Sequence, residues 1–366
     1  MKIVHVVDSM DVGGAETLVS QMCRLQRDQG HNPSILAVAN LGPLGEKLRD
    51  EGFTVQPDIG RHLSDSARNF FRIFKELKPD VVHLHNPTPT IYASTAARMA
   101  GVPSIVSTRH SLAAPPHNAI AELKYAFAAL FCDWIVGICD ATTENLRKMR
   151  TAPARKITRV YNGAVPVTRV EKRQRPFDGV FTLVFVGRLA AVKNHPLLLT
   201  AFREALSSMP GLQLWIVGDG AERKALESLA RELGISTAVT FWGQQLDVAP
   251  YFCGADAFIM SSKSEGLPIS LLQAFSVGLP VIVTDVGGMA EVVRLAQAGV
   301  TAPVTDPAGM AAGILRLAEN DAERAQFSKN AEQAFHSRFA LQTMVDAYMD
   351  LYRNTPRARR AANNGV

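Results

Sequence analysis

The chain has 366 residues, of which 47% are hydrophobic and 20% are charged. This balance excludes a mainly disordered chain, and the length favours two domains over one. The four cysteines include no C-x-x-C pair, so we predict free thiols in a reducing cytosol rather than a zinc or redox motif.

The formal net charge of +5 lies entirely in the first half of the chain. Residues 1–170 hold 20 basic and 15 acidic side chains, and the remaining residues hold 19 of each. Such a half attracts phosphates, anionic lipid or an acidic substrate, unless the excess is only solvated surface. No nucleic-acid-binding module is recognisable. The N-terminus reaches Asp8 too soon for a signal peptide, so we expect a cytoplasmic protein, at most bound to the inner face of the cytoplasmic membrane.

Short apolar runs alternate with helical patterns twice along the chain. The predicted strands of the first half are 2–7, 33–39, 81–85, 104–107 and 134–138, and its predicted helices include 15–29, 44–51, 65–77 and 90–100. The second half has predicted strands 182–186, 213–217, 238–241, 257–260 and 281–284, and predicted helices 196–208, 221–233 and 269–276. Apolar strands separated by helices predict parallel sheets covered on both faces.

A proline-containing charged stretch separates the two halves. We predict one doubly wound α/β domain over 1–165, a linker over 166–180 and a second such domain over 181–340. A last helix in 341–366, with a basic tail, is expected to cross back to the first domain. Because ligands of such sheets bind beyond the carboxyl ends of the strands, we expect the site in a cleft between the two domains.

Two glycine-containing junctions follow predicted strands. Gly13 and Gly14 open a helix, where free backbone N–H groups attract an anion, although a tight turn explains the same glycines. The strand that ends at Gly187 is followed by Arg188 and Lys193, a guanidinium and an ammonium five residues apart. Two cations that converge at a strand end can neutralise a diphosphate.

The stretch 261–278 carries the strongest signal. Pro268 suits the first turn of a helix, Gly266 lets the backbone pass close to a ligand, and Glu265 stands before that helix. Gln273 lies on the same helix. A carboxylate and an amide so placed can hold sugar hydroxyls.

Two further patterns have competing interpretations. The apolar face of helix 65–77, with Phe70 and Phe74, predicts either a core-facing helix or a helix that grips anionic lipid. We expect the rings of His83 and His85 to point in opposite directions from their strand, so that they do not share a metal.

The 261–278 string resembles the E-x7-E region of the family 4 glycosyltransferases, which are retaining enzymes with the GT-B fold of two Rossmann-like domains. The resemblance runs from residue 3 to about residue 295. Its other motifs stand in the family's order: Gly-Gly-Ala-Glu near the start, Gly-Arg followed by Lys, Gly-Asp-Gly, Asp256 before the string, and 280–288 after it.

The resemblance implies roles for individual residues. Arg188 and Lys193 would clamp the donor diphosphate, Glu265 would bind donor-sugar hydroxyls, and His110 would face the sugar at the reaction centre. The other implied donor contacts are Gly14, Gly187, Gly243, Gln244, Gly266, Leu267 and Gln273. His85 and Arg109 are expected on the acceptor side.

The chain departs from the family pattern at one functional position. Gln273 stands where the family usually has a second glutamate that binds ribose hydroxyls, so the charge-assisted part of that contact, about 1 kcal/mol, is lost. Because no D-x-D sequence occurs, we expect neither a bound metal nor another cofactor.

The sequence therefore predicts a retaining, metal-independent glycosyltransferase. It would move a sugar from a nucleotide-diphosphate donor to a saccharide or lipid-linked acceptor in envelope or exopolysaccharide biosynthesis, with peripheral contact to an anionic membrane and no nucleic-acid partner. The alternatives are an enzyme like the nucleotide-sugar 2-epimerases and a non-catalytic nucleotide-sugar binding module.

Overall fold

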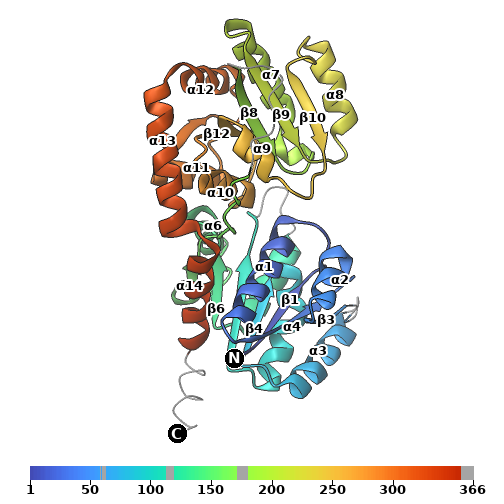
Figure 1. Cartoon of the computed structure of the whole chain (residues 1–366). Coiled ribbons are helices and arrows are strands. Elements are labelled where there is room, and N and C mark those ends of the chain that lie inside the picture. The colour runs from blue at the N-terminus through green and yellow to red at the C-terminus, as the bar shows by residue number, and fades with distance from the viewer. Residues whose placement is uncertain (58, 60–62, 113–118, 171–179, 356–366) are drawn as a thin grey trace. The chain divides into compact units, whose positions relative to one another are not determined.

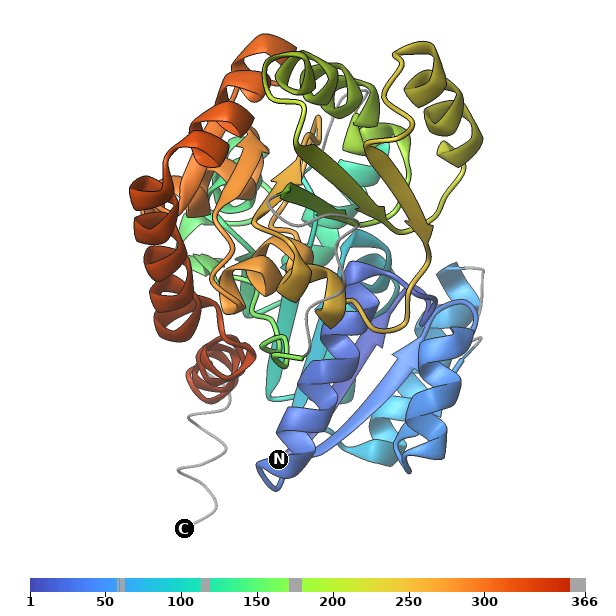
Figure 2. The same ribbon diagram turned by 45° about the horizontal axis from the view of Figure 1, so that its top comes forward.

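The structure is a computed structural model that describes residues 1–366 except 58, 60–62, 113–118, 171–179 and 356–366. It divides into two units: unit 1 comprises Met1–Gly163 with the C-terminal segment from Leu341, and unit 2 comprises Ala164–Ala340. Each unit is a sheet with helices on both faces (Figures 1 and 2). Most of the predicted linker and the predicted basic tail lie outside the described residues.

Unit 1 contains a seven-stranded sheet in the order β3-β2-β1-β4-β5-β6-β7, and its paired strands run parallel. The order reverses between β1 and β4, because the chain builds outward first on one side of β1 and then on the other (Figure 1). The strands are β1 Lys2–Val7, β2 Asn32–Ala37, β3 Thr54–Gln56, β4 Val81–His85, β5 Ser104–Arg109, β6 Trp134–Gly137 and β7 Ile157–Arg159.

Helices cover both faces of this sheet and bury its apolar side chains. Val7 and Ile35 on one face form a core with Val19 and Cys23 of α1. Val6 and Leu84 on the other face belong to the larger core that the helices α3, α4 and α5 complete. The helices of unit 1 are α1 Gly14–Asp28, α2 Gly42–Asp50, α3 Leu63–Leu77, α4 Pro87–Ala100, α5 Ala119–Ala129, α6 Asp140–Lys148 and α14 Leu341–Arg353.

Unit 2 repeats this topology with a six-stranded sheet in the order β10-β9-β8-β11-β12-β13, reversing between β8 and β11. Its strands are β8 Phe181–Val186, β9 Leu212–Val217, β10 Val239–Gly243, β11 Ala257–Met260, β12 Val281–Thr284 and β13 Gly299–Ala302. Its helices are α7 His195–Ser208, α8 Arg223–Glu232, α9 Ala249–Gly254, α10 Ile269–Ser276, α11 Gly287–Ala296, α12 Pro307–Glu319 and α13 Asp321–Ala334.

Every predicted strand is present, with ends that shift by at most two residues. The strands at 54–56, 157–159 and 299–302 were not predicted. All three are short strands at an edge of their sheet. An edge strand of three or four residues is too short to develop a recognisable hydrophobic pattern.

Helix α3 faces the core. Phe70 and Phe74 are fully buried, and their rings stack with centroids 5.7 Å apart. The core-facing interpretation of this helix is confirmed, and the interpretation as a lipid-gripping helix is wrong, because the phenyl rings that would enter the lipid already pack on the sheet.

Helix α14 packs on unit 1. Tyr348 and Tyr352 are buried there, and the Tyr352 hydroxyl lies 2.7 Å from Nδ1 of His83 on β4. The backbone N–H of Gly163 donates to Sδ of Met344 over 3.2 Å. The last described helix is therefore part of the first unit.

Candidate active site

In unit 2, the loops that follow the adjacent strands β8 and β11 meet at the reversal of strand order. The Ser261 hydroxyl donates to the carbonyls of Lys193 and Asn194, at 2.8 and 3.1 Å. The Lys263 N–H donates to the Val192 carbonyl over 2.8 Å. These contacts tie the two loops together at the carboxyl ends of the strands, where sheets of this kind bind ligands.

This tie brings Lys193 and Glu265 into contact, although they are 72 residues apart in the sequence. The Lys193 ammonium donates to Oε1 of Glu265 over 2.5 Å, and the Ser262 hydroxyl donates to the same oxygen over 3.0 Å. Both charged side chains are 16% exposed. The pair is thus held in place and remains partly exposed.

Arg188 lies in the first of these loops, directly after Gly187, and its side chain is exposed. Within the described residues its guanidinium forms no ion pair or hydrogen bond. An exposed guanidinium without a carboxylate partner is available to an anion.

The glycines beside this loop allow two backbone segments to approach closely. A Cβ on Gly218, whose φ is 137°, would lie 1.9 Å from the carbonyl oxygen of Gly187. The Gly-Asp-Gly motif therefore lets the loop after β9 pass against the loop after β8, which is a structural reason for its glycines.

The remaining predicted contacts of unit 2 occupy different environments. Gly243 ends β10 with a φ of 69°, and Gln244 after it is exposed. Gly266 and Leu267 are buried, and the Gly266 carbonyl accepts from Gly288 N–H over 2.8 Å. Gln273 is half-buried on α10.

In unit 1, Gly14 is the first residue of α1, is exposed, and has open space where a Cβ would stand. Its neighbour Gly13 caps the helix without a side-chain hydrogen bond. The Glu16 carboxylate lies beside Gly13 at the start of α1, whereas Gly14 itself is exposed.

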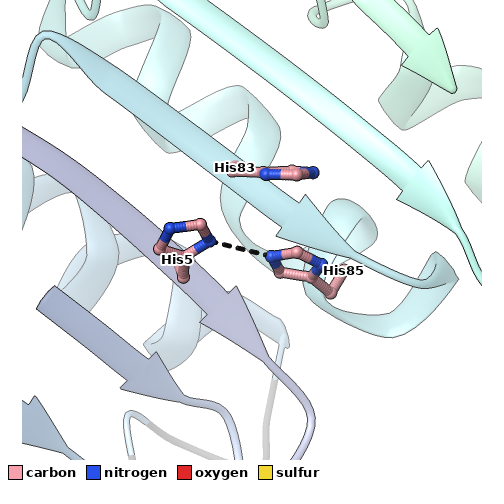
Figure 3. Close-up of side chains that lie close together, drawn as sticks. All are labelled: His5, His83 and His85. Carbon is pink, nitrogen blue, oxygen red and sulfur yellow. Dashed lines mark hydrogen bonds between the residues drawn. The ribbon is translucent and has the colours of Figure 1, made fainter. Parts of the chain in front are cut away.

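Four histidines gather near the reversal point of unit 1. His5 on β1 is paired in register with His83 on β4, and His85 lies two residues further along β4 (Figure 3). Hydrogen bonds of 3.0 Å join His5 Nδ1 to His85 Nε2, and His85 Nδ1 to His110 Nε2. His5 Nε2 also lies 2.8 Å from Oε1 of Gln26 on α1.

His83 belongs to a separate branch of the same cluster. Its Nδ1 lies 2.7 Å from the Tyr352 hydroxyl, and its Nε2 lies 2.7 Å from Oγ1 of Thr108. Thr108 Oγ1 in turn lies 2.9 Å from the Tyr348 hydroxyl. Both nitrogens of the ring are therefore occupied by hydroxyl groups of the protein.

Burial keeps these histidines neutral. It lowers the pKa of His5 and of His110 to about 4. It also lowers the pKa values of His83 and His85 well below the usual 6.5, helped by the neighbouring imidazoles. A buried ring without a carboxylate partner cannot hold a proton at neutral pH.

The expectation that His83 and His85 point in opposite directions is wrong. Successive side chains alternate across a sheet, so residues two apart lie on the same face, and the two ring centroids are 4.0 Å apart. Ring nitrogens of His5, His83 and His85 lie within 4.8 Å of one another. Nevertheless the His83 ring is tilted over the His85 ring and already paired at both nitrogens, which does not suit a shared metal.

The two residues expected on the acceptor side do not present free polar groups. His85 is 2% exposed, and both its nitrogens are taken by other histidines. Arg109 is 4% exposed and donates to both carboxylate oxygens of Glu122, at 2.6 and 2.7 Å. Their direct acceptor contact is not supported, because burial and partners within unit 1 account for both side chains.

Sequence reasoning missed His5, Gln26, Tyr348 and Tyr352 in unit 1, and the role of Ser262 beside Glu265 in unit 2. The one available signal was the spacing of His83 and His85, because two residues that are two positions apart on a strand share a face. No local sequence pattern indicates that a tyrosine near residue 350 contacts a histidine at residue 83.

The two doubly wound units define the class: the protein has the GT-B fold of glycosyltransferases. Solved structures of this fold align over almost the whole chain, among them that of Anabaena HepE in complex with UDP, with a TM-score of 0.81 over 96% of this chain and 99% of that one. At 20% identity this likeness shows the fold alone.

The family follows from sequence comparison. Residues 12–166 match the family model described as Glycosyltransferase Family 4, and residues 167–334 match the one described as Glycosyl transferases group 1. The lipopolysaccharide core biosynthesis glycosyltransferase LpsD of Rhizobium meliloti (strain 1021) is 32% identical over 363 residues, which are 96% of this chain and 98% of LpsD. The chain belongs to the family 4 glycosyltransferases.

A second relative matches over a shorter stretch. LpsE of the same organism, also a lipopolysaccharide core biosynthesis glycosyltransferase, is 32% identical over 153 residues, which are 42% of this chain and 45% of LpsE. Among the described residues, no helix combines the length and the apolar character that crossing a membrane requires.

Proposed function

We propose that this glycosyltransferase moves a sugar from a nucleotide-diphosphate donor, with retention of configuration, onto a saccharide or lipid-linked acceptor in envelope polysaccharide biosynthesis. Two relatives are lipopolysaccharide core glycosyltransferases, and a structural neighbour binds UDP, which supports both parts of the proposal. Family membership disfavours the epimerase and the non-catalytic binding module.

The observation that carries the proposal is the group Arg188, Lys193 and Glu265 at the reversal point of unit 2. In our proposal Arg188 and Lys193 bind the donor diphosphate, because cations at a strand end stabilise the charge that develops on a leaving phosphate. Glu265 accepts hydroxyl hydrogens of the donor sugar beside them. Ser262 then holds this carboxylate when Lys193 turns toward the diphosphate.

The transfer step that fits these groups needs no enzymic nucleophile. The acceptor hydroxyl oxygen bonds to the anomeric carbon from the side of the leaving group, and the bond between that carbon and the phosphate oxygen breaks. The departing phosphate oxygen takes the hydroxyl proton. Configuration is retained, and the negative charge that develops on the departing oxygen before it takes the proton lies next to Arg188 and Lys193.

Our proposal assigns the other donor contacts to five further residues. Gly14 offers the open start of α1 to the distal phosphate, and His110 orients the sugar or stabilises positive charge through its backbone carbonyl. Backbone at Gly243 and Gln244 lies near the base, and Gln273 contacts the ribose. We also propose that the transfer reaction needs no metal ion.

The test is a panel of UDP-, GDP- and ADP-sugars with and without lipid-linked acceptors, with the anomeric configuration of the product read by NMR. For the donor that is turned over, we expect Arg188→Ala to lower kcat/KM by about 10²–10³-fold, because one charge-stabilising contact is lost in the transition state. The matched control is Arg203→Ala, which removes another exposed arginine of unit 2. Near-normal turnover by Arg188→Ala, or an inverted product, contradicts the proposal.

Helix α5, together with the residue that follows it, offers a surface for the proposed contact with an anionic membrane. Ile120, Leu123, Phe127 and Leu130 are 67%, 72%, 62% and 55% exposed. Their spacing of three and four residues places them along one side, next to the exposed Lys124. An apolar stripe with a cation beside it fits the interface of an anionic bilayer.

Sedimentation with liposomes tests this contact. We expect the chain to pellet with phosphatidylglycerol-containing vesicles and not with neutral ones, and the double variant Leu123→Asp, Phe127→Asp to stay in the supernatant. Leu246→Asp changes a fully exposed leucine of unit 2 and should pellet like the unchanged chain. Equal pelleting of the double variant would exclude α5 as the membrane surface.

A further inference from the structure

A continuous line of hydrogen bonds crosses unit 1 beneath the ends of its central strands. It begins at the Gln26 side chain on α1, passes through His5 on β1 and His85 on β4, and ends at His110 after β5. The three contacts measure 2.8, 3.0 and 3.0 Å. Gln26, His5 and His85 are at most 2% exposed, so water does not interrupt the line.

All the hydrogen bonds of this line must donate in the same sense along it, because each neutral imidazole carries a single N–H and a single acceptor nitrogen. Oε1 of Gln26 is an acceptor, so His5 must donate to it from Nε2. Nδ1 of His5 then accepts from Nε2–H of His85, and Nδ1 of His85 accepts from Nε2–H of His110. The last ring is left with its lone pair on Nδ1.

This last atom lacks a partner in the described part of the chain. Nδ1 of His110 is buried and has no hydrogen-bond partner among the described residues. The backbone N–H of the same residue donates to Oδ1 of Asn86 over 3.0 Å, which fixes the start of the loop that carries the ring. A buried acceptor that finds no donor among the described residues is available to a donor from a ligand.

We propose that Gln26, His5 and His85 are positioning residues that hold His110 with Nδ1 unprotonated, as the acceptor for a hydroxyl group of the sugar substrate. This inference rests on the proposed glycosyl transfer. The positioning matters because the other tautomer would turn an N–H toward the same hydroxyl oxygen and remove that acceptor. Within this line of hydrogen bonds, only His110 contacts the substrate.

A shared metal is the competing explanation for such a cluster. A divalent ion among His5, His83 and His85 would have to replace the hydrogen bond between His5 and His85, and one of the bonds from His83 to Tyr352 or Thr108. Within the described part of the chain, no carboxylate lies among these ligand atoms to offset a buried double charge. The hydrogen-bonded arrangement satisfies every ring nitrogen of the three residues without that cost.

NMR of histidine side chains tests the positioning directly. In the chain labelled with ¹⁵N-histidine, long-range ¹H–¹⁵N spectra separate protonated from unprotonated ring nitrogens, and single His→Gln variants assign the peaks. We expect His5, His85 and His110 all to be protonated at Nε2. His110 protonated at Nδ1 in the unchanged chain would overturn the proposal.

Matched variants separate positioning from packing. His85→Gln keeps one acceptor and one donor, and we expect it to preserve the His110 tautomer, whereas His85→Leu should mix the two tautomers. His83→Leu removes an equally buried ring from the same strand but lies outside the line, so the His110 tautomer should not change. If thermal unfolding shows that His85→Leu does not fold, Gln26→Met is measured in its place, because it acts at the far end of the same line. An unchanged His110 tautomer in every folded variant of this pair would overturn the proposal.

Turnover supplies the second readout. With the donor identified by the nucleotide-sugar panel, we expect kcat to fall by about tenfold or more in His85→Leu and to stay within about threefold in His85→Gln, because a tenfold change corresponds to one lost hydrogen bond. Equal losses in both variants would overturn the positioning role. Zinc-induced shifts of the His5, His83 and His85 resonances would establish a metal site instead. Absence of any transfer defeats the proposed function, while the tautomers remain measurable without it.

Discussion

Lowering the pH from 7.5 to 5.5 should destabilise the protein because its buried histidines are folded in the neutral form. Burial lowers the pKa of His5 and His110 to about 4, and those of His83 and His85 well below 6.5. In the unfolded chain each returns to about 6.5. Only the unfolded chain takes up protons between pH 6.5 and 4. The contribution of these histidines to the free energy of unfolding is therefore fully present above pH 6.5 and is lost as the pH falls from 6.5 toward 4.

The magnitude follows from the number of groups. One histidine that stays neutral when folded loses roughly 1 kcal/mol of stability between pH 7.5 and 5.5, so the four in unit 1 lose on the order of 5 kcal/mol together. This is comparable with the whole stability of many domains. His195 of unit 2, whose pKa burial and the nearby Lys193 charge lower to about 4, adds one more group.

Calorimetry in buffers of different ionisation enthalpy measures the protons taken up on unfolding. At pH 5.5 each of these histidines should contribute about 0.9 proton, so the four of unit 1 and His195 give between about four and five. His83→Leu should lower the uptake by about one proton. An uptake below two protons, or a melting temperature that is flat between pH 7.5 and 5.5, would show that the cluster is charged or open to water and refute the reasoning.

Two substitutions in unit 2 test its loops. Gln273→Glu should restore a charge-assisted contact of about 1 kcal/mol and tighten binding of the donor's nucleoside diphosphate about fivefold, and an unchanged Kd by titration calorimetry would remove Gln273 from the ribose contact. Gly218→Ala should lower stability by about 2 kcal/mol or more, because its Cβ would lie 1.9 Å from the Gly187 carbonyl oxygen at a φ of 137°. Gly211→Ala, where a Cβ meets nothing within 4 Å, is the control, and equal melting temperatures of the two variants would contradict the close approach.

The sequence by itself determined most of the strands, several of the helices and about half of the boundaries of those elements. The strands 2–7, 81–85, 257–260 and 281–284 and the helix 269–276 agree with prediction at both ends, because their apolar patterns are local and are bounded by glycine, proline or polar residues. The sequence also placed Arg188 and Lys193 directly after a strand, since a strand end is a local property.

Only the tertiary structure decided which of these strand ends are neighbours. The strand order puts β8 beside β11, and the hydroxyl of Ser261 then locks together two loops whose charged residues, Lys193 and Glu265, are 72 positions apart. The same rule acts in unit 1, where parallel pairing of β1 with β4 brings His5 and His85 together over 80 positions.

The contact between His83 and Tyr352 spans 269 positions and depends on α14 packing against the first unit. The spacing of hydrophobic residues shows which face of a helix or strand is buried, but not which element covers that face. Apart from the spacing of His83 and His85, the histidine cluster could not be predicted from the sequence. Its members are brought together by the register of a sheet and by a returning helix, and neither is encoded in the residues next to them in the chain.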